Sequence, residues 1–215
     1  MSAEKFTKKK KAKTGEKKQK FAEKTVFAPL KPKEEVVLIP PGKLNICVIG
    51  AVAIGGLVAA YLRHKMRKVY VVGKPEQMCA IRMNGLRVEG AKGTVYIEIP
   101  IKERMEEKAD LVIVAVKTQD VQGVIDSNRE FLRDSLILTT QNGVRTDTII
   151  ARTLGEKNII SSIVMFGATY LKPGVITHNF EGDWIIGRPF GVNDEKVKEV
   201  EEELAPAFKT VVADN

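Results

Sequence analysis

The sequence predicts an α/β fold built on a doubly wound, mostly parallel β-sheet. Short and almost continuously apolar runs recur along the chain, as expected of strands that are buried on both faces. Segments with helical spacing alternate with these runs, an order that is typical of parallel sheets. A turn with the sequence G-A-V-A-I-G-G joins the first strand to the first helix at residues 50–56. Together these observations favour a Rossmann-like arrangement.

The net charge of +8 comes almost entirely from the N-terminal segment. Residues 1–35 hold 12 lysines and five glutamates, whereas the other 180 residues carry 23 basic and 22 acidic side chains. We therefore predict a disordered, Lys-rich tail at residues 1–42 and one Rossmann-like domain at residues 43–215. The run Lys8–Lys13 is compatible with a nuclear address or a nucleic-acid patch. We favour a solvated basic tail, because such motifs are short and common.

The few cysteines and histidines argue against several classes of protein. Cys47 and Cys79 are too few for a disulfide framework, and no metal-ligand spacing joins them to His64 or His178. We interpret Cys47 as a small buried hydrophobe and His178 as structural. No apolar run reaches the length of a membrane span, and the N-terminus is charged, unlike a signal peptide. We expect a cytoplasmic protein without a membrane partner, with a nuclear location only through Lys8–Lys13.

The parallel part of the fold is expected in the first three quarters of the domain. The predicted strands are residues 44–50, 68–72, 110–116, 135–140 and 158–165. The predicted helices are residues 54–65, residues 76–84, a segment that ends near residue 131, residues 146–154 and residues 193–204. Gly85 follows the second helix as a C-cap signal.

Other segments indicate antiparallel pairing. Residues 86–89 and 95–99 alternate like the exposed strands of a small hairpin. The turn dipeptide Pro173-Gly174 separates residues 168–172 from 175–179 and marks a second hairpin. With residues 184–187, this second hairpin is expected to be an antiparallel extension of the main sheet, and residues 208–212 are expected to be the last strand.

Polar or glycine residues follow four of the predicted parallel strands. They are the turn at residues 50–56, Lys74, Lys117 and Asn142. Ligands of doubly wound sheets bind beyond the carboxyl ends of the strands, so these residues are expected to line one site. Lys74 stands where NAD-specific folds carry an acidic residue, so its positive charge favours NADP. The alternatives are solvated turn lysines at Lys74 and Lys117, and an ordinary tight turn at Asn142.

The glycine motif departs from G-x-G-x-x-G at its middle position. Its positions are residues 50, 52 and 55, and the second is Val52. A glycine there normally lets the backbone approach the phosphates, so the valine is expected to displace the pyrophosphate or to force a different loop. The alternative is the core strand and helix of some other α/β protein.

Several segments, taken together and in order, resemble the ketopantoate reductases (2-dehydropantoate 2-reductases). They are I-C-V-I-G-A-V-A-I-G-G, V-V-G-K-P-E, D-L-V-I-V-A-V-K-T-Q-D-V, Q-N-G-V, F-G-A-T-Y-L-K-P-G-V-I-T-H and G-D-W-I-I-G-R. The resemblance covers residues 44–215 and implies the NADPH-dependent reduction of ketopantoate, a 2-keto acid, in the pantothenate and coenzyme A pathway.

The resemblance also implies roles for individual residues. The pyrophosphate would be held by Gly50, Ala51, Val52, Ala53, Ile54 and Gly55. Lys74 stands where the family usually has an arginine for the 2′-phosphate, and Lys117 matches a cofactor-contacting lysine. Asn142 matches an asparagine shared by cofactor and substrate, and Ala168 lies at or beside a cofactor-lining position. Of these residues, only Asn142 would also take part in catalysis, by positioning.

The resemblance stops short of the family's helical second domain. That domain would carry the proton-donating lysine, further substrate contacts and much of the dimer contact. Whether this chain forms a homo-oligomer is left open by the sequence. We therefore expect the NADP-binding half of a reductase, with little or no activity alone. Two alternatives are a non-catalytic nucleotide-binding or nucleotide-sensing domain whose basic tail targets a nucleus or nucleic acid, and a degenerate product that folds poorly.

Overall fold

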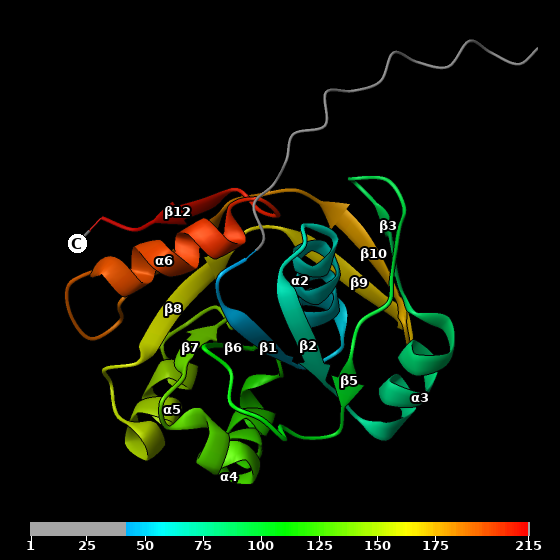
Figure 1. Cartoon of the computed structure of the whole chain (residues 1–215). Coiled ribbons are helices and arrows are strands. Elements are labelled where there is room, and N and C mark those ends of the chain that lie inside the picture. The colour runs from blue at the N-terminus through cyan, green and yellow to red at the C-terminus, as the bar shows by residue number, and fades with distance from the viewer. Residues whose placement is uncertain (1–41, 215) are drawn as a thin grey trace, which may run out of the picture. The chain divides into compact units, whose positions relative to one another are not determined.

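The computed structural model describes residues 42–214, which form two β-sheets and their helices (Figure 1). The larger sheet has eight strands in the order β12-β11-β8-β7-β6-β1-β2-β5. Its strands are β1 (Asn45–Ile49), β2 (Lys68–Val72), β5 (Ile101–Lys102), β6 (Leu111–Val114), β7 (Leu136–Thr139), β8 (Ile159–Val164), β11 (Trp184–Gly187) and β12 (Thr210–Val212). Every neighbouring pair is parallel except β11 with β8, which confirms the predicted mostly parallel sheet.

The central strand β1 shows why the buried runs are apolar throughout. Ile46 and Val48 belong to the cluster on one face of the sheet, and Cys47 and Ile49 to the cluster on the other, and all four are at most 2% exposed. Alternate side chains of a strand point to opposite faces, so a strand covered on both sides needs no polar positions. Burial raises the pKa of the Cys47 thiol to about 12, which keeps it a neutral apolar side chain as expected.

Helices cover both faces of the main sheet. α4 (Val121–Leu132) and α5 (Arg145–Leu154) contribute buried residues to the Cys47 face, below the sheet in Figure 1. α2 (Ala53–His64) covers the Ile46 face, and its residues from Gly55 to Leu62 are all buried. A helix that is buried all round must be covered on its far side as well.

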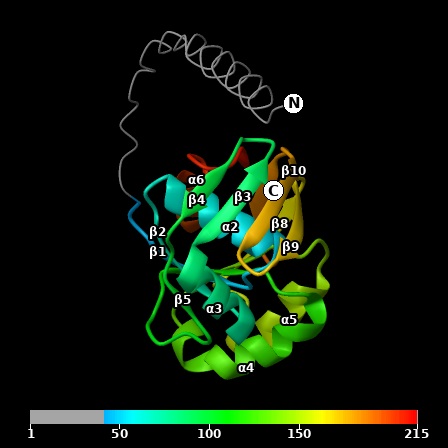
Figure 2. The same ribbon diagram turned by 90° about the vertical axis from the view of Figure 1, so that its right-hand side faces the viewer.

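A second sheet provides that cover and corrects two predictions. Its strands β4 (Val95–Ile97), β3 (Leu86–Gly90), β10 (Val175–Phe180) and β9 (Gly167–Lys172) lie over α2 in this order (Figure 2). The hairpin of β9 and β10 therefore does not extend the main sheet, because β10 pairs with β3. The hairpin of β3 and β4 is not simply exposed, because Leu86 and Val88 are buried.

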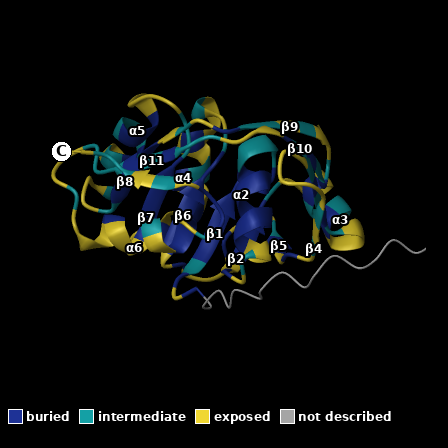
Figure 3. Cartoon of the chain, turned by 90° about the horizontal axis from the view of Figure 1, so that it is seen from above, coloured by how far each residue is buried: buried dark blue, intermediate teal, exposed yellow. Residues whose placement is uncertain are grey.

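The close approach of the second sheet depends on Gly56. A Cβ atom at Gly56 would overlap the Cδ1 atom of Ile176 on β10. Figure 3 shows most of α2 in dark blue, as expected of a helix that both sheets cover. The hairpin belongs to the second sheet because α2 offers it an apolar surface, and local periodicity does not reveal which element covers which surface.

The remaining elements follow their predicted boundaries closely. α3 (Pro75–Asn84) ends at Gly85, whose φ of +69° confirms the predicted glycine C-cap. α6 (Glu195–Leu204) begins after Asp194, whose carboxylate accepts a hydrogen bond from the Val197 N–H. The edge strand β5 escapes sequence-based prediction, because two residues show no periodicity.

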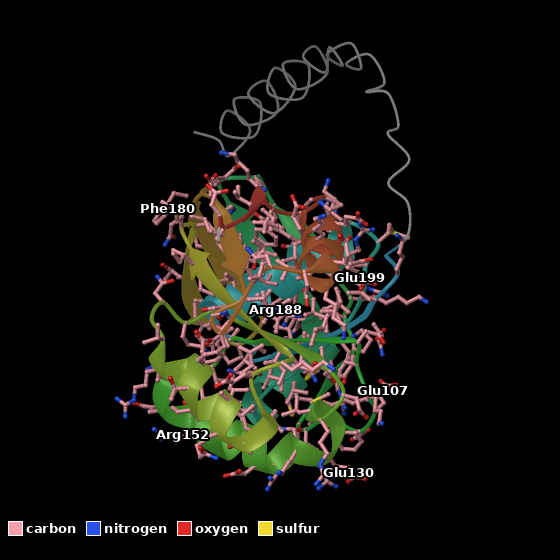
Figure 4. All side chains as sticks on the ribbon, turned by 90° about the vertical axis from the view of Figure 1, so that its left-hand side faces the viewer. Glu107, Glu130, Arg152, Phe180, Arg188 and Glu199 are labelled. Atoms are coloured by element: carbon pink, nitrogen blue, oxygen red, sulfur yellow. The ribbon has the colours of Figure 1, made fainter. Side chains whose placement is uncertain are left out.

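Arg188, which is labelled in Figure 4, directly follows β11 and forms hydrogen bonds with neighbouring segments. Its guanidinium donates to the carbonyl oxygens of Lys157 and Ile159, both at 2.9 Å, and to the carboxylate of Asp194 at 2.9 Å.

The residues described include no helix of the length and apolar character needed to cross a membrane. The predicted basic tail, with Lys8–Lys13, lies outside the described residues apart from Gly42.

Candidate functional site

The turn after β1 lies where three strands of the main sheet end. Gly50 has a φ of +115°, a conformation that favours glycine, and its N–H donates to the Val72 carbonyl at the end of β2 at 2.8 Å. A Cβ atom at Gly50 would lie 2.8 Å from the carbonyl oxygen of Ala115, which follows β6. β2 and β6 lie on either side of β1 in the sheet. The turn after β1 therefore packs against the carboxyl ends of both neighbouring strands.

The start of α2 has the properties of an anion site. Its N-cap is Val52, no side chain caps it, and its first turn has no acidic residue. The N–H of Gly56 donates to the Val52 carbonyl at 2.7 Å, whereas the earlier N–H groups of a helix have no intrahelical acceptor. Unpaired N–H groups and the positive end of the helix dipole favour a phosphate at this position.

Val52 does not disturb the backbone of the turn by itself. Its φ of −109° and ψ of −158° are extended values, which valine adopts readily. The side chain is partly exposed. That the Val52 side chain displaces a bound pyrophosphate stays a prediction. The displacement would come from steric contact between this side chain and the phosphates.

Lys74 lies beside the glycine turn. It is the exposed N-cap of α3, and its N–H donates to Oε1 of Gln77 at 3.0 Å. A Cβ atom at the preceding Gly73 would lie 3.0 Å from the Cβ atom of Ala51. The Lys74 backbone is thus held next to the turn, while its ammonium group extends into solvent.

Lys117 and Asn142 lie at the ends of the adjacent strands β6 and β7. Lys117 is the exposed N-cap of the short 3₁₀-helix η2 (Thr118–Asp120). The exposed Asn142 accepts a hydrogen bond at Oδ1 from the Val164 N–H at 3.2 Å, at the end of β8. This bond leaves the Nδ2 group of Asn142 as a donor toward a ligand.

The predicted site residues therefore lie in a row along one edge of the main sheet. The row follows the carboxyl ends of β2, β1, β6, β7 and β8, which are neighbours in the sheet in this order. Ala168 lies further on, near the start of β9, where it is partly buried against the apolar cluster that includes Ile46. Ala168 thus lies beyond the row, on the strand that follows β8 in the chain.

One residue of the row carries no specific role in the sequence-based prediction. The side-chain amide of Gln141 donates to the carbonyl oxygens of Val114 and Val116, at 3.1 and 2.6 Å. The available signal is the Q-N-G-V segment, in which the resemblance implies a role for the asparagine alone. Nothing in the sequence shows that this glutamine reaches the neighbouring strand.

His178 has the surroundings of a structural residue, as predicted. It is 2% exposed, and its Nδ1 atom lies 2.9 Å from the hydroxyl oxygen of Tyr61 on α2. Burial raises the pKa of Tyr61 to about 12 and lowers the pKa of His178. Within residues 42–214, no group of three or more His, Cys, Asp or Glu side chains is arranged to hold a metal ion.

A groove of about 800 Å³ lies elsewhere on the molecule. It is lined by the C-terminal part of α3, by β4 with the residues after it, and by Arg63. Arg63 is near the C-terminal end of α2, whereas the glycine turn is at the N-terminal end of this helix. The groove is therefore separate from the row of predicted site residues.

Comparisons with known proteins agree with the predicted family. The family model described as ketopantoate reductase PanE/ApbA matches residues 46–189. The 2-dehydropantoate 2-reductase of Halobacterium salinarum is 30% identical over 178 residues, which are 81% of this chain and 54% of that protein. The enzyme of the same name from Pyrococcus horikoshii is 30% identical over 174 residues, covering 80% of this chain and 57% of that protein.

Solved structures share the fold. A putative 2-dehydropantoate 2-reductase from Enterococcus faecalis superposes with a TM-score of 0.73 at 21% identity, over 80% of this chain and 57% of that one. D-mandelate dehydrogenase with NADH and anilino(oxo)acetate gives a TM-score of 0.73 at 21% identity, over 79% and 57%. The chain spans about half the length of the curated relatives it matches. The match of the family model over two thirds of the sequence shows that this chain belongs to the ketopantoate reductase family.

Proposed function

We propose that residues 42–214 bind NADP(H) and form the cofactor-binding half of a 2-dehydropantoate 2-reductase. The observation that supports this most is the uncapped start of α2, which faces the carboxyl edge of the sheet between β2 and β6. The family supplies the reaction, and the named relatives are 2-dehydropantoate 2-reductases.

The described residues fit a dinucleotide in three respects. First, a Cβ atom at Gly50 would collide with the backbone of Ala115, so the tight turn between β1 and α2 requires glycine at this position. Second, the first turn of α2 has no acidic side chain to repel a pyrophosphate. Third, Lys74 and Lys117 offer exposed ammonium groups on either side of the turn. In this proposal Lys74 faces the 2′-phosphate, which selects NADP over NAD.

The bound cofactor would supply the hydride for reduction of the keto group. The residues of this chain would position it. The backbone amides after Gly50 would hold the pyrophosphate, and Lys117 would lie beside the phosphates or the nicotinamide ribose. The Nδ2 group of Asn142 would donate to a ribose or keto oxygen, while its Oδ1 atom stays bonded to the Val164 N–H.

Reduction of a ketone also needs charge stabilisation or a proton at the carbonyl oxygen. The match covers about half of each relative's length, and we propose that a helical domain, in the same chain or in a partner, supplies this proton. A steady-state assay with 2-dehydropantoate, with and without an added helical domain, tests this step. Turnover only with the added domain is the expected result, and no turnover in either case would leave cofactor binding alone.

Fluorescence titration with NADPH and NADH tests cofactor binding directly. We expect submillimolar binding of NADPH and weaker binding of NADH. Lys74→Glu should weaken NADPH binding by about tenfold or more, since a charge pair becomes a repulsion, and should change NADH binding much less. Lys196→Glu on the exposed surface of α6 is the matched control and should change neither. Absence of measurable binding of either nucleotide would overturn the proposal.

A further inference from the structure

One side chain connects the main chain beside Lys117 to the main chain beside Asn142. Gln141 directly precedes Asn142, and Val116 directly precedes Lys117. The Nε2 group of Gln141 donates to the carbonyl oxygen of Val116 at 2.6 Å and to that of Val114 at 3.1 Å. Lys117 and Asn142, the two exposed residues assigned to the cofactor, therefore each directly follow one partner of the Gln141–Val116 hydrogen bond.

This link begins where the regular pairing of the strands stops. The parallel ladder between β6 and β7 ends with Val114 opposite Thr139. One residue further, both the N–H and the hydroxyl of Thr140 bond to the Val114 carbonyl at 3.2 Å. Beyond this point the chain after β6 turns into η2, and the chain after β7 continues toward α5. The amide of Gln141 extends the connection between the two segments to Val116.

The orientation of the Gln141 amide is set by its two acceptors. Because Nε2 points at two carbonyl oxygens, Oε1 must point away from them. Oε1 is buried, and the described part of the chain offers it no hydrogen-bond partner. An unpaired buried amide oxygen costs stability, so this glutamine is not explained by stability alone. Because Oε1 is buried, it is also not a group that contacts a ligand.

We propose that Gln141 is a positioning residue that sets the separation of Lys117 and Asn142 so that both contact the same bound cofactor. This inference rests on the proposed function. Asn142 is then held from two sides, by Gln141 toward β6 and by its own bond to the Val164 N–H toward β8. Loss of the Gln141 link would let the segments after β6 and β7 move independently. NADPH would then have to order these two segments when it binds, which would weaken its binding.

A double-mutant cycle tests the inference through NADPH binding. Lys117→Ala and Gln141→Leu should each weaken NADPH binding by about tenfold. Their combination should be little weaker than either single variant, because Lys117 contributes only while Gln141 holds its segment in place. If the loss of NADPH affinity in the double variant equals the product of the losses in the two single variants, the inference is overturned. The same holds if Gln141→Leu binds NADPH as tightly as the wild type.

Two further variants separate positioning from general stability. Thr140→Val is the matched control, because it removes a side-chain bond to the Val114 carbonyl and none to Val116; its affinity for NADPH should match that of the wild type. Gln141→Glu should bind weakly at neutral pH and regain affinity as the pH falls, because only a protonated carboxyl can donate to the Val116 carbonyl. A Gln141→Glu variant without this pH dependence, or an equal loss in Thr140→Val, would contradict the positioning role.

The same measurements distinguish failure of this inference from failure of the proposed function. If the wild type binds no NADPH, the proposed function is wrong and the inference falls with it. If the wild type binds NADPH and both Lys117→Ala and Asn142→Ala bind as it does, the roles given to these two residues are wrong, and the inference falls while cofactor binding stands. If those two variants bind weakly while Gln141→Leu binds normally, only the inference is wrong. Urea unfolding of each variant shows which of them are folded, and Gln141→Glu is the second variant if Gln141→Leu does not fold.

Discussion

The Cα atom of Gly55 packs directly against the carbonyl oxygen of Gly50. A Cβ atom at Gly55 would overlap this oxygen and would lie 2.8 Å from the Cβ atom of Ala115. The first turn of α2 is thereby held against the end of β1 and beside the end of β6. This contact directs the N-terminal end of the helix toward the row of candidate site residues.

Gly55→Ala should therefore impair both folding and nucleotide binding. The added methyl group meets backbone, which moves only with the whole turn, so we expect a loss of about 1–3 kcal/mol in the free energy of unfolding. Gly123→Ala in α4 is the control, because nothing lies within 4 Å of its Cβ position. It should stabilise the protein by about 0.5–1 kcal/mol. Urea unfolding measures both, and an unaffected Gly55→Ala would show that the turn can shift.

Val52→Gly should strengthen NADPH binding. The valine side chain occupies the position where a glycine normally lets the backbone approach the phosphates, so its removal should lower the Kd by about tenfold. Titration of both proteins under the same conditions measures the change, with Val192→Gly, at an exposed valine away from the row of site residues, as the control that should leave the Kd unchanged. An unchanged Kd would show that Val52 does not contact the pyrophosphate.

Asp147 should contribute strongly to stability. It is 1% exposed, and its carboxylate accepts hydrogen bonds from the hydroxyls of Thr139 and Ser161 at 2.8 and 2.7 Å. Asp147→Ala would leave both hydroxyls without this acceptor, which should cost about 2–4 kcal/mol. Asp126→Ala, at an exposed carboxylate on α4, should change stability by less than about 0.5 kcal/mol. If urea unfolding shows the same loss of stability in Asp147→Ala and Asp126→Ala, the buried carboxylate of Asp147 does not have the role described.

His178 should make the folded protein less stable in mild acid. Burial lowers its pKa from the ordinary value of 6.5, and the nearby Lys92 lowers it further, while the Phe180 backbone and Glu181 act in the opposite direction. The unfolded chain therefore takes up the proton first as the pH falls below about 6.5, so the free energy of unfolding decreases until the folded protein is protonated too.

Substitution of each histidine tests this pH dependence. His178→Gln keeps a polar partner for Tyr61 and should lose less stability than the wild type between pH 7.5 and about pH 5. The other histidine, His64, is exposed, so His64→Gln should follow the wild type. Denaturant unfolding across this range measures the slopes. A slope for His178→Gln equal to that of the wild type would mean that His178 does not titrate differently in the two states.

Much of the fold follows from short-range patterns. β2 and β11 begin and end where the sequence predicts, because each contains a short apolar run, residues 69–72 and 184–186, that polar residues or glycines border on both sides. The positions of Lys74, Lys117 and Asn142 at one edge follow from the rule that parallel strands end together. The sequence therefore predicts the row of candidate site residues without knowledge of any contact.

The amino-acid sequence alone determined the parallel sheet and the edge at which its polar residues gather, since both depend on local periodicity and strand direction. The tertiary structure alone decided that β9 and β10 join β3 across α2, and that Gln141 bonds to Val116. The physical reason is that a local pattern shows which surfaces are apolar and which groups can donate. The partner of each surface and each donor depends on packing and register between segments that are far apart in the chain.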